Sequence, residues 1–268
     1  MNSTDQRYSD LIDRFALKAD DTLFLSSDLG KLANYFKSQG VKFDVNEFID
    51  SIQQRIPQGT LIIPAYTDNL TNGDTFELLR SKPTTGALSN RVFKRKDFKR
   101  TKDPLHSVFV WGKKAEELTE LKDESTFGPN SIFGFLENDN AIMVIIDVHF
   151  NNSFTFVHFV EQRLNVKFRK AYYWKIKVAD EEKTYEKNLI FYTKKMGVVT
   201  DLDELQAYLI EKNCVQNNDF HGIPVLRVDL KNSAKWTETF ICSVGKTYRF
   251  DPVLWLKQVV KKLIGRKY

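Results

Sequence analysis

AIMVIIDVHFNNSFTFVHFVE, residues 141–161, joins the most apolar run of the chain to a segment that carries Thr155, His158 and Glu161. Residues 141–148 predict a buried β-strand, because a short uninterrupted apolar run is typical of a strand covered on both faces. The following segment predicts a helix in which His158 and Glu161, three positions apart, are side-chain neighbours. A strand that leads into a helix in this way is a building unit of an α/β sheet.

Strands and helices also alternate on the N-terminal side of this stretch. Short apolar runs predict strands at residues 22–27, 60–66 and 107–112, and helical periodicity predicts helices at 29–38, 45–56 and 113–120. Residues 67–102 are mostly polar and predict a long loop with short helices, and loops of this length tend to be functional. The order predicts an α/β fold with a mixed, largely parallel sheet covered by helices on both faces.

The pattern changes after residue 168. Residues 171–178 and 188–193 alternate as half-exposed strands do, which predicts an antiparallel β addition in the C-terminal part. Residues 201–212 predict a further helix, and residues 222–229 a strand. No repeat or linker divides the sequence, so residues 1–268 are expected to form a single domain, with a possible β subdomain at about 169–225.

The chain ends in an amphipathic helix that starts at Asp251-Pro252, with an apolar stripe on one side and lysines opposite. Such a helix either lies on a membrane surface or packs on its own core. Packing on the core is the commoner arrangement and is the one that the sequence favours.

The composition is that of a globular protein, with 268 residues of which 42% are hydrophobic. No apolar run reaches the roughly 18 residues of a membrane span and the first residues carry no apolar leader, so we expect a cytoplasmic protein without integral membrane association. Cys214 and Cys242 lack the close partners of a zinc site. The motifs of dinucleotide enzymes, P-loop ATPases and nucleophile-elbow hydrolases are missing from the sequence.

The net charge is +5, and basic residues concentrate between Arg91 and Lys102. Such a cluster favours an anionic partner such as a phosphate group. A basic module that binds nucleic acid or a membrane surface is therefore an alternative to an enzyme. We expect no nucleic-acid partner, because no reader fold and no regular aromatic interleaving accompany the cluster.

The start of the predicted helix sets the chemistry of His158. Asn152, Ser153 and Thr155 offer caps, and the positive end of a helix disfavours an imidazolium, so His158 should stay neutral and able to accept a proton. Glu161 can hold the ring tautomer and stabilise the charge that forms during proton transfer.

Two other interpretations are compatible with the same spacing. His158 and Glu161 can be metal ligands together with Asp147 and His149, whose spacing at a strand end is that of a half-site. Alternatively, the pair is a polar contact on the surface of a helix whose phenylalanines and valines do the packing. The spacing alone does not separate these interpretations from a catalytic pair.

The chain resembles the aminoglycoside 3-N-acetyltransferase family, also called the antibiotic N-acetyltransferases, over roughly residues 20–170. Six segments stand in the family's order: Leu23–Ser27, Gly59–Thr67, Thr85–Phe93, Arg100–Ser107, Phe127–Ser131 and Thr155–Glu161. The resemblance implies an α/β fold and transfer of acetyl from acetyl-coenzyme A to an amine without a covalent enzyme intermediate. Acetyl-coenzyme A is thus the expected co-substrate, and no metal is expected.

The resemblance also implies roles for individual residues. The family's His-x-x-Glu falls on His158 and Glu161, as the general base and its carboxylate. The residues implied to hold coenzyme A and the thioester are Ser26, Ser27, Arg100, Thr101, Ser107 and Thr155. The residues expected to contact the acceptor are Tyr66, Asp68 and Asp103.

Departures from the family pattern bear on the acceptor. Asp103 stands where antibiotic-modifying members usually have histidine, and the chain is basic, whereas an aminoglycoside is a polycation that needs an acidic cleft. We therefore expect a small-molecule amino-sugar acceptor linked to a nucleotide, used in surface-polysaccharide (O-antigen or capsule) synthesis. The alternative is an aminoglycoside in an acidic pocket that includes Asp68, Asp103 and Glu161. A homodimer is the expected assembly.

Overall fold

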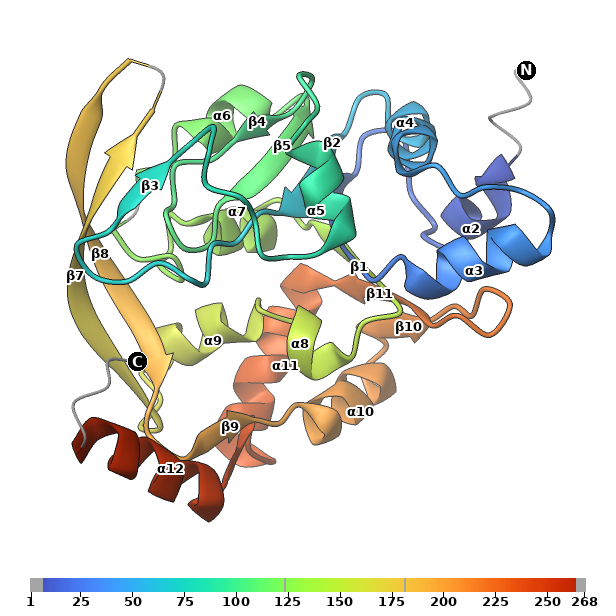
Figure 1. Cartoon of the computed structure of the whole chain (residues 1–268). Coiled ribbons are helices and arrows are strands. Elements are labelled where there is room, and N and C mark those ends of the chain that lie inside the picture. Colours follow the sequence, from blue (N-terminus) through green and yellow to red (C-terminus); the bar gives the residue numbers. More distant parts are fainter. Residues whose placement is uncertain (1–6, 123, 181, 264–268) are drawn as a thin grey trace.

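The computed structural model describes residues 7–122, 124–180 and 182–263, and it is built around a seven-stranded mixed sheet (Figure 1). In sheet order the strands are β10 (Val215–Asn217), β11 (Val225–Asp229), β6 (Ile142–Ile146), β1 (Thr22–Ser27), β2 (Thr60–Pro64), β5 (Val108–Gly112) and β4 (Lys99–Arg100). β1 pairs in parallel with β2 and with β6, whereas the outer strands pair antiparallel. The predicted mixed α/β sheet is confirmed, and its parallel part is the three central strands.

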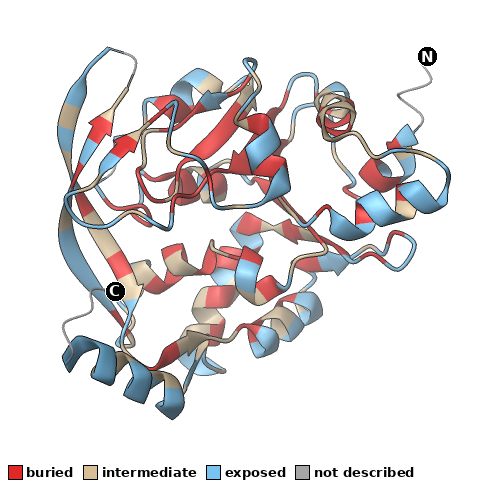
Figure 2. Ribbon diagram, in the orientation of Figure 1, coloured by how far each residue is buried: buried red, intermediate tan, exposed pale blue. Residues whose placement is uncertain are grey.

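Successive residues of the central strands face two different layers of helices. Leu23 and Leu25 of β1 belong to one apolar core, and Phe24 between them belongs to another. Residues of the first layer come from α2 (Ser9–Asp13), α3 (Gly30–Ser38), α4 (Val45–Arg55) and α5 (Ala87–Val92). Residues of the second come from α6 (Ala115–Thr119), α7 (Ile132–Asn138), α9 (Val157–Arg163), α10 (Asp203–Glu211) and α11 (Leu230–Ser243). Both faces of the sheet are thus covered, as predicted, and the buried strands have no polar face (Figure 2).

Helix α11 is not predicted from the sequence. It follows strand β11 directly, with Asp229 as the last strand residue and as the N-cap, whose side chain accepts from the backbone N–H of Asn232 at 3.0 Å. No turn residue separates the strand from the helix, so the N-cap Asp229 is the one sequence signal at this boundary.

The C-terminal part adds a second, smaller sheet. β7 (Arg169–Ala179) and β8 (Thr184–Lys194) form an antiparallel hairpin, and β3 (Thr75–Glu77) pairs with β7 in parallel. The predicted antiparallel addition is confirmed (Figure 1). β10 and β11 join the large sheet, so residues 169–225 do not coincide with one sheet.

Two short elements complete the C-terminal region. β9 (Val198–Thr200) pairs with β12 (Tyr248–Phe250), and α12 (Pro252–Leu263) follows. Within the described ranges, no helix combines the length and the apolar character that crossing a membrane requires.

Candidate active site

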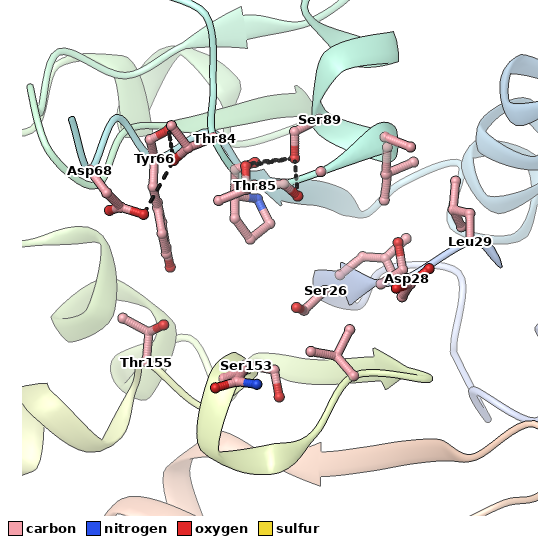
Figure 3. Close-up of a pocket in the computed structure, with 18 of the residues that line it drawn as sticks. Ser26, Asp28, Leu29, Tyr66, Asp68, Thr84, Thr85, Ser89, Ser153 and Thr155 are labelled. Atoms are coloured by element: carbon pink, nitrogen blue, oxygen red, sulfur yellow. Dashed lines mark hydrogen bonds between the residues drawn. The ribbon is translucent and has the colours of Figure 1, made fainter. Parts of the chain in front are cut away.

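A cavity of about 900 Å³ lies at the carboxyl ends of the three parallel strands. Ligands of open α/β sheets bind at this edge, because loops from neighbouring strands converge there. Ser26 extends from β1, Tyr66 follows β2, and Thr155 follows β6, and the three lie around the same space (Figure 3). Six of the predicted site residues line the cavity: Ser26, Ser27, Tyr66, Asp68, Thr155 and His158.

His158 lies in the first turn of α9, as the sequence predicts. The capping prediction is wrong, because the N-cap residue is Phe156 and no side chain caps the helix. The segment forms two helices instead of one: Ser153 ends the short helix α8 (Phe150–Ser153), and α9 begins four residues later. Thr155 lies between the two helices and lines the cavity together with His158.

A buried network of charges holds His158. Its Nδ1 lies 2.8 Å from Oε2 of Glu161, and Nε of Arg169 lies 2.6 Å from the same carboxylate oxygen. The hydroxyl of Thr247 donates to Oε1 of Glu161 at 2.6 Å. The side chains of Glu161 and Arg169 are only 1% and 4% exposed. Electrostatic interactions are stronger away from water, so this network fixes both the position and the charge of its members.

The same surroundings set the protonation states. Burial, together with the positive charge of Arg169, lowers the pKa of His158 to about 4. Burial alone would raise the pKa of Glu161, but His158, Arg169 and the Thr247 hydroxyl outweigh it, and the pKa of Glu161 is lowered. At neutral pH the imidazole is therefore neutral and the carboxylate ionised. A neutral imidazole keeps one ring nitrogen unprotonated, and this nitrogen can accept a proton. Nη2 of Arg169 lies 2.6 Å from Nδ1 and 3.1 Å from Nε2 of His158.

The structure also bears on the two competing interpretations of the pair. Glu161 is fully buried, so the pair is not a surface contact. Among the described residues, no group of three or more His, Cys, Asp and Glu side chains is arranged to hold a metal. Asp147, which the metal interpretation adds together with His149, lies 2.6 Å from the ammonium of Lys31 instead.

Asp103 does not line the cavity. Its Oδ1 accepts from the backbone N–H groups of Leu105 and His106 at 2.8 Å each, and the hydroxyl of Thr126 donates to its Oδ2 at 2.6 Å. Asp103 therefore caps the turn that places His106 in the cavity wall. Burial lowers the pKa of His106, so this second imidazole of the cavity is neutral as well.

The residues of the basic run that were expected to hold coenzyme A lie behind the cavity wall. Arg100 is buried and donates to the carbonyl of Ala65 at 2.8 Å and to Ser107 Oγ at 3.0 Å. Ser107 donates to the same carbonyl at 2.7 Å, and Thr101 Oγ1 accepts from the backbone N–H of Val108 at 2.9 Å. These contacts support the segment after β2, which carries Tyr66.

Other cations of this run are paired on the surface. Arg95 lies 2.7 Å from Asp97 and 2.7 Å from Asp50, Lys102 lies 3.7 Å from Glu120, and Lys99 pairs with Glu116. Within the described part of the chain, the ionised side chains that line the cavity are Asp28, Asp68 and Lys194.

Fold and site together define an α/β enzyme in which a neutral histidine, backed by a buried carboxylate, faces a ligand cavity. A family model described as aminoglycoside 3-N-acetyltransferase matches residues 36–241, which is well over half of the chain. The chain belongs to the aminoglycoside 3-N-acetyltransferase family and is an acetyl-coenzyme A-dependent N-acetyltransferase. The family resemblance seen in the sequence is confirmed.

Solved structures share the fold. The aminoglycoside acetyltransferase AAC(3)-Xa superposes with a TM-score of 0.74 at 13% identity, over 90% of this chain and 92% of that chain. AAC-IIIb in a binary complex with CoASH superposes with a TM-score of 0.73 at 14% identity, over 91% of this chain and 97% of that chain. AAC-VIa bound to sisomicin superposes with a TM-score of 0.71 at 13% identity, over 90% of this chain and 97% of that chain. No curated protein matches the sequence.

Several residues of the site are not predicted from the sequence: His106, Asp28 and Lys194 of the cavity lining, and Thr247 and Arg169 of the buried network. Arg169 is the clearest case. It lies at the start of β7, eight positions after Glu161, and its contacts depend on how the hairpin folds back on α9. In the structure Arg169 is the first residue of β7 and is buried, at a position where an apolar residue is usual.

Replacing Arg169 by methionine leaves the buried carboxylate of Glu161 without its cation. Because an unpaired buried charge is costly, we expect the free energy of unfolding to fall by about 3–5 kcal/mol. Denaturant unfolding of R169M, E161Q and the double variant measures this, and the double variant should regain more than half of the loss. Arg249, 58% exposed beside Asp201, is the matched control, and R249M should cost about 1 kcal/mol or less. Equal losses for R169M and R249M would contradict the account.

Proposed function

We propose that the enzyme acetylates a primary amine of an amino sugar by direct attack of the amine on acetyl-coenzyme A. His158 is the general base, and Glu161 is the carboxylate that orients it. The observation that carries the proposal is the geometry of the pair: a neutral imidazole in the cavity wall, 2.8 Å from a carboxylate that is shielded from water.

In the proposed reaction the amine nitrogen attacks the carbonyl carbon of the thioester. His158 takes a proton from that nitrogen as the new C–N bond forms. Nδ1 faces Glu161, so Nε2 is proposed to accept the proton. Nη2 of Arg169 lies 3.1 Å from Nε2, so the substrate amine would displace this contact. The C–S bond then breaks, and the coenzyme leaves as a thiolate that takes up the proton. The ionised Glu161 stabilises the imidazolium that exists between these two proton transfers.

Ser27 is proposed to donate to the carbonyl oxygen of the thioester as negative charge develops on it. Its hydroxyl is buried in the cavity wall and has no hydrogen-bond partner among the described residues, so its donor is available. Ser26 and Thr155 line the same space and are proposed to contact the acetyl group and the pantetheine arm (Figure 3).

The acceptor is proposed to be a cationic amino sugar of the aminoglycoside kind. The carboxylates of Asp28 and Asp68 line the cavity and attract a polycation, and the relative AAC-VIa is bound to the aminoglycoside sisomicin. A nucleotide-linked amino sugar, expected from the net charge, needs cations for its phosphates. Lys194 is the cationic side chain that the described cavity lining offers, and no residue of the basic run 91–102 lines the cavity.

His158→Asn tests the proposed base. We expect kcat/KM for acceptor-dependent thiol release from acetyl-coenzyme A to fall by about 10²–10⁴-fold, because asparagine keeps the polarity but cannot accept the proton. Coenzyme A binding, followed by calorimetry, should survive. His221, which stacks on Tyr35 outside the cavity lining, is the control, and H221N should turn over like the wild type. Near wild-type turnover by H158N would refute the mechanism.

Asp68→Asn tests the acceptor class. With a panel of aminoglycosides and nucleotide-linked amino sugars, we expect thiol release with the former. D68N should raise KM for the aminoglycoside by roughly fivefold, because one attractive charge near a surface contributes about 1 kcal/mol. Asp20, at the opposite end of β1 from the cavity, is the matched control. If only the nucleotide-linked sugars were turned over, the proposed aminoglycoside acceptor would be wrong, whereas the proposed acetyl transfer would stand.

A further inference from the structure

Helix α12 presents an apolar stripe to solvent. Val253, Leu256, Val260 and Leu263 are 60%, 57%, 47% and 80% exposed, and no residue of the helix is buried. Their spacing of three, four and three positions puts the four side chains on one side of the helix. The prediction that this stripe packs on the core is therefore wrong, because its side chains are exposed. In Figure 2 most of the ribbon of α12 has the colour of exposed residues.

The opposite side of α12 is what holds the helix in place. The backbone N–H of Gly197 donates to Oε1 of Gln258 at 2.7 Å, and the N–H of Asp251 donates to the carbonyl of Gly197 at 2.7 Å. Asp251 also caps the helix, since its Oδ1 accepts from the N–H of Leu254 at 2.9 Å. The helix is thus a fixed part of the fold, docked beside β9 with its apolar stripe turned outward.

The border of the stripe is basic. Lys257 and Lys261 are exposed beside the stripe, Lys262 is exposed on the other side of the helix, and residues 252–263 include no aspartate or glutamate. Lys257 and Lys261, four positions apart, form a row next to the stripe. In the part of the chain that the structure describes, none of the three lysines forms an ion pair, whereas Lys99 and Lys102 are paired with carboxylates.

We infer that α12 lies on an anionic membrane surface, with the apolar stripe inserted at the level of the headgroups and the lysines next to lipid phosphates. An apolar stripe bordered by lysines is the pattern of helices that lie in a membrane interface, and anionic lipids supply the complementary charge. A second copy of the chain is less suitable, because each partner of a stable protein interface contributes about 20–30 residues and this stripe has four. The helix contributes no residue to the cavity lining, so the inference is independent of the acceptor.

Co-sedimentation of the full chain with phosphatidylcholine vesicles, with and without phosphatidylglycerol, tests the inference. We expect binding to the anionic vesicles that weakens at high salt. L256S/V260S should lower the partition coefficient at least about tenfold, since two inserted side chains are lost. K257Q/K261Q should lower it by about fivefold for each lysine. Y173S removes a side chain that is 84% exposed on β7 and should bind like the wild type.

Retained acetyl transfer in solution shows that each variant is folded. Two results would overturn the inference: absence of binding to the anionic vesicles, or equal binding by L256S/V260S and the wild type. A dimer in solution that L256S/V260S abolishes, without lipid binding, would assign the stripe to a second copy and would also overturn it.

Discussion

The buried ion pair between Arg169 and Glu161 is the contact on which the site depends. It joins the first strand of the hairpin to helix α9, which packs on the large sheet, and one carboxylate oxygen serves both the guanidinium and the imidazole of His158. A buried pair of this kind is stable only when its remaining hydrogen bonds are made. The Thr247 hydroxyl donates a further hydrogen bond to the carboxylate of Glu161, at 2.6 Å. The network that joins β7 to α9 thus also gives the imidazole of His158 its orientation and its low pKa.

The topology of the sheet explains why the cavity lies beside this network. The three parallel strands end at one edge, so the segments after β1, β2 and β6 meet there. The buried bonds of Arg100 and Ser107 to the carbonyl of Ala65 hold the wall on which Tyr66 sits. Residues that the family motifs link to ligand binding therefore divide into two groups. One group faces the cavity, and the other supports the backbone behind it.

The sequence predicts those features that depend on near neighbours in the chain. The central strands are visible because burial on both faces leaves an unbroken apolar run such as residues 142–146, and the His158–Glu161 contact follows from helical spacing. Features that depend on distant residues are not visible. The partners of the basic run are carboxylates such as Glu116 and Glu120, and Arg169 meets Glu161 only after the hairpin folds back. The outward stripe of α12 is a further case, because periodicity defines a stripe but not what covers it.

The proposed proton transfer needs an imidazole of His158 that stays neutral because burial and Arg169 disfavour its protonation. NMR of the chain with ¹⁵N-labelled histidine, followed from pH 8 to pH 4, tests this directly through the ring-nitrogen shifts of His158. The account predicts the shifts of a neutral ring down to about pH 5, with protonation only near the pKa of about 4. A titration midpoint near 6.5, the ordinary value for histidine, would contradict it.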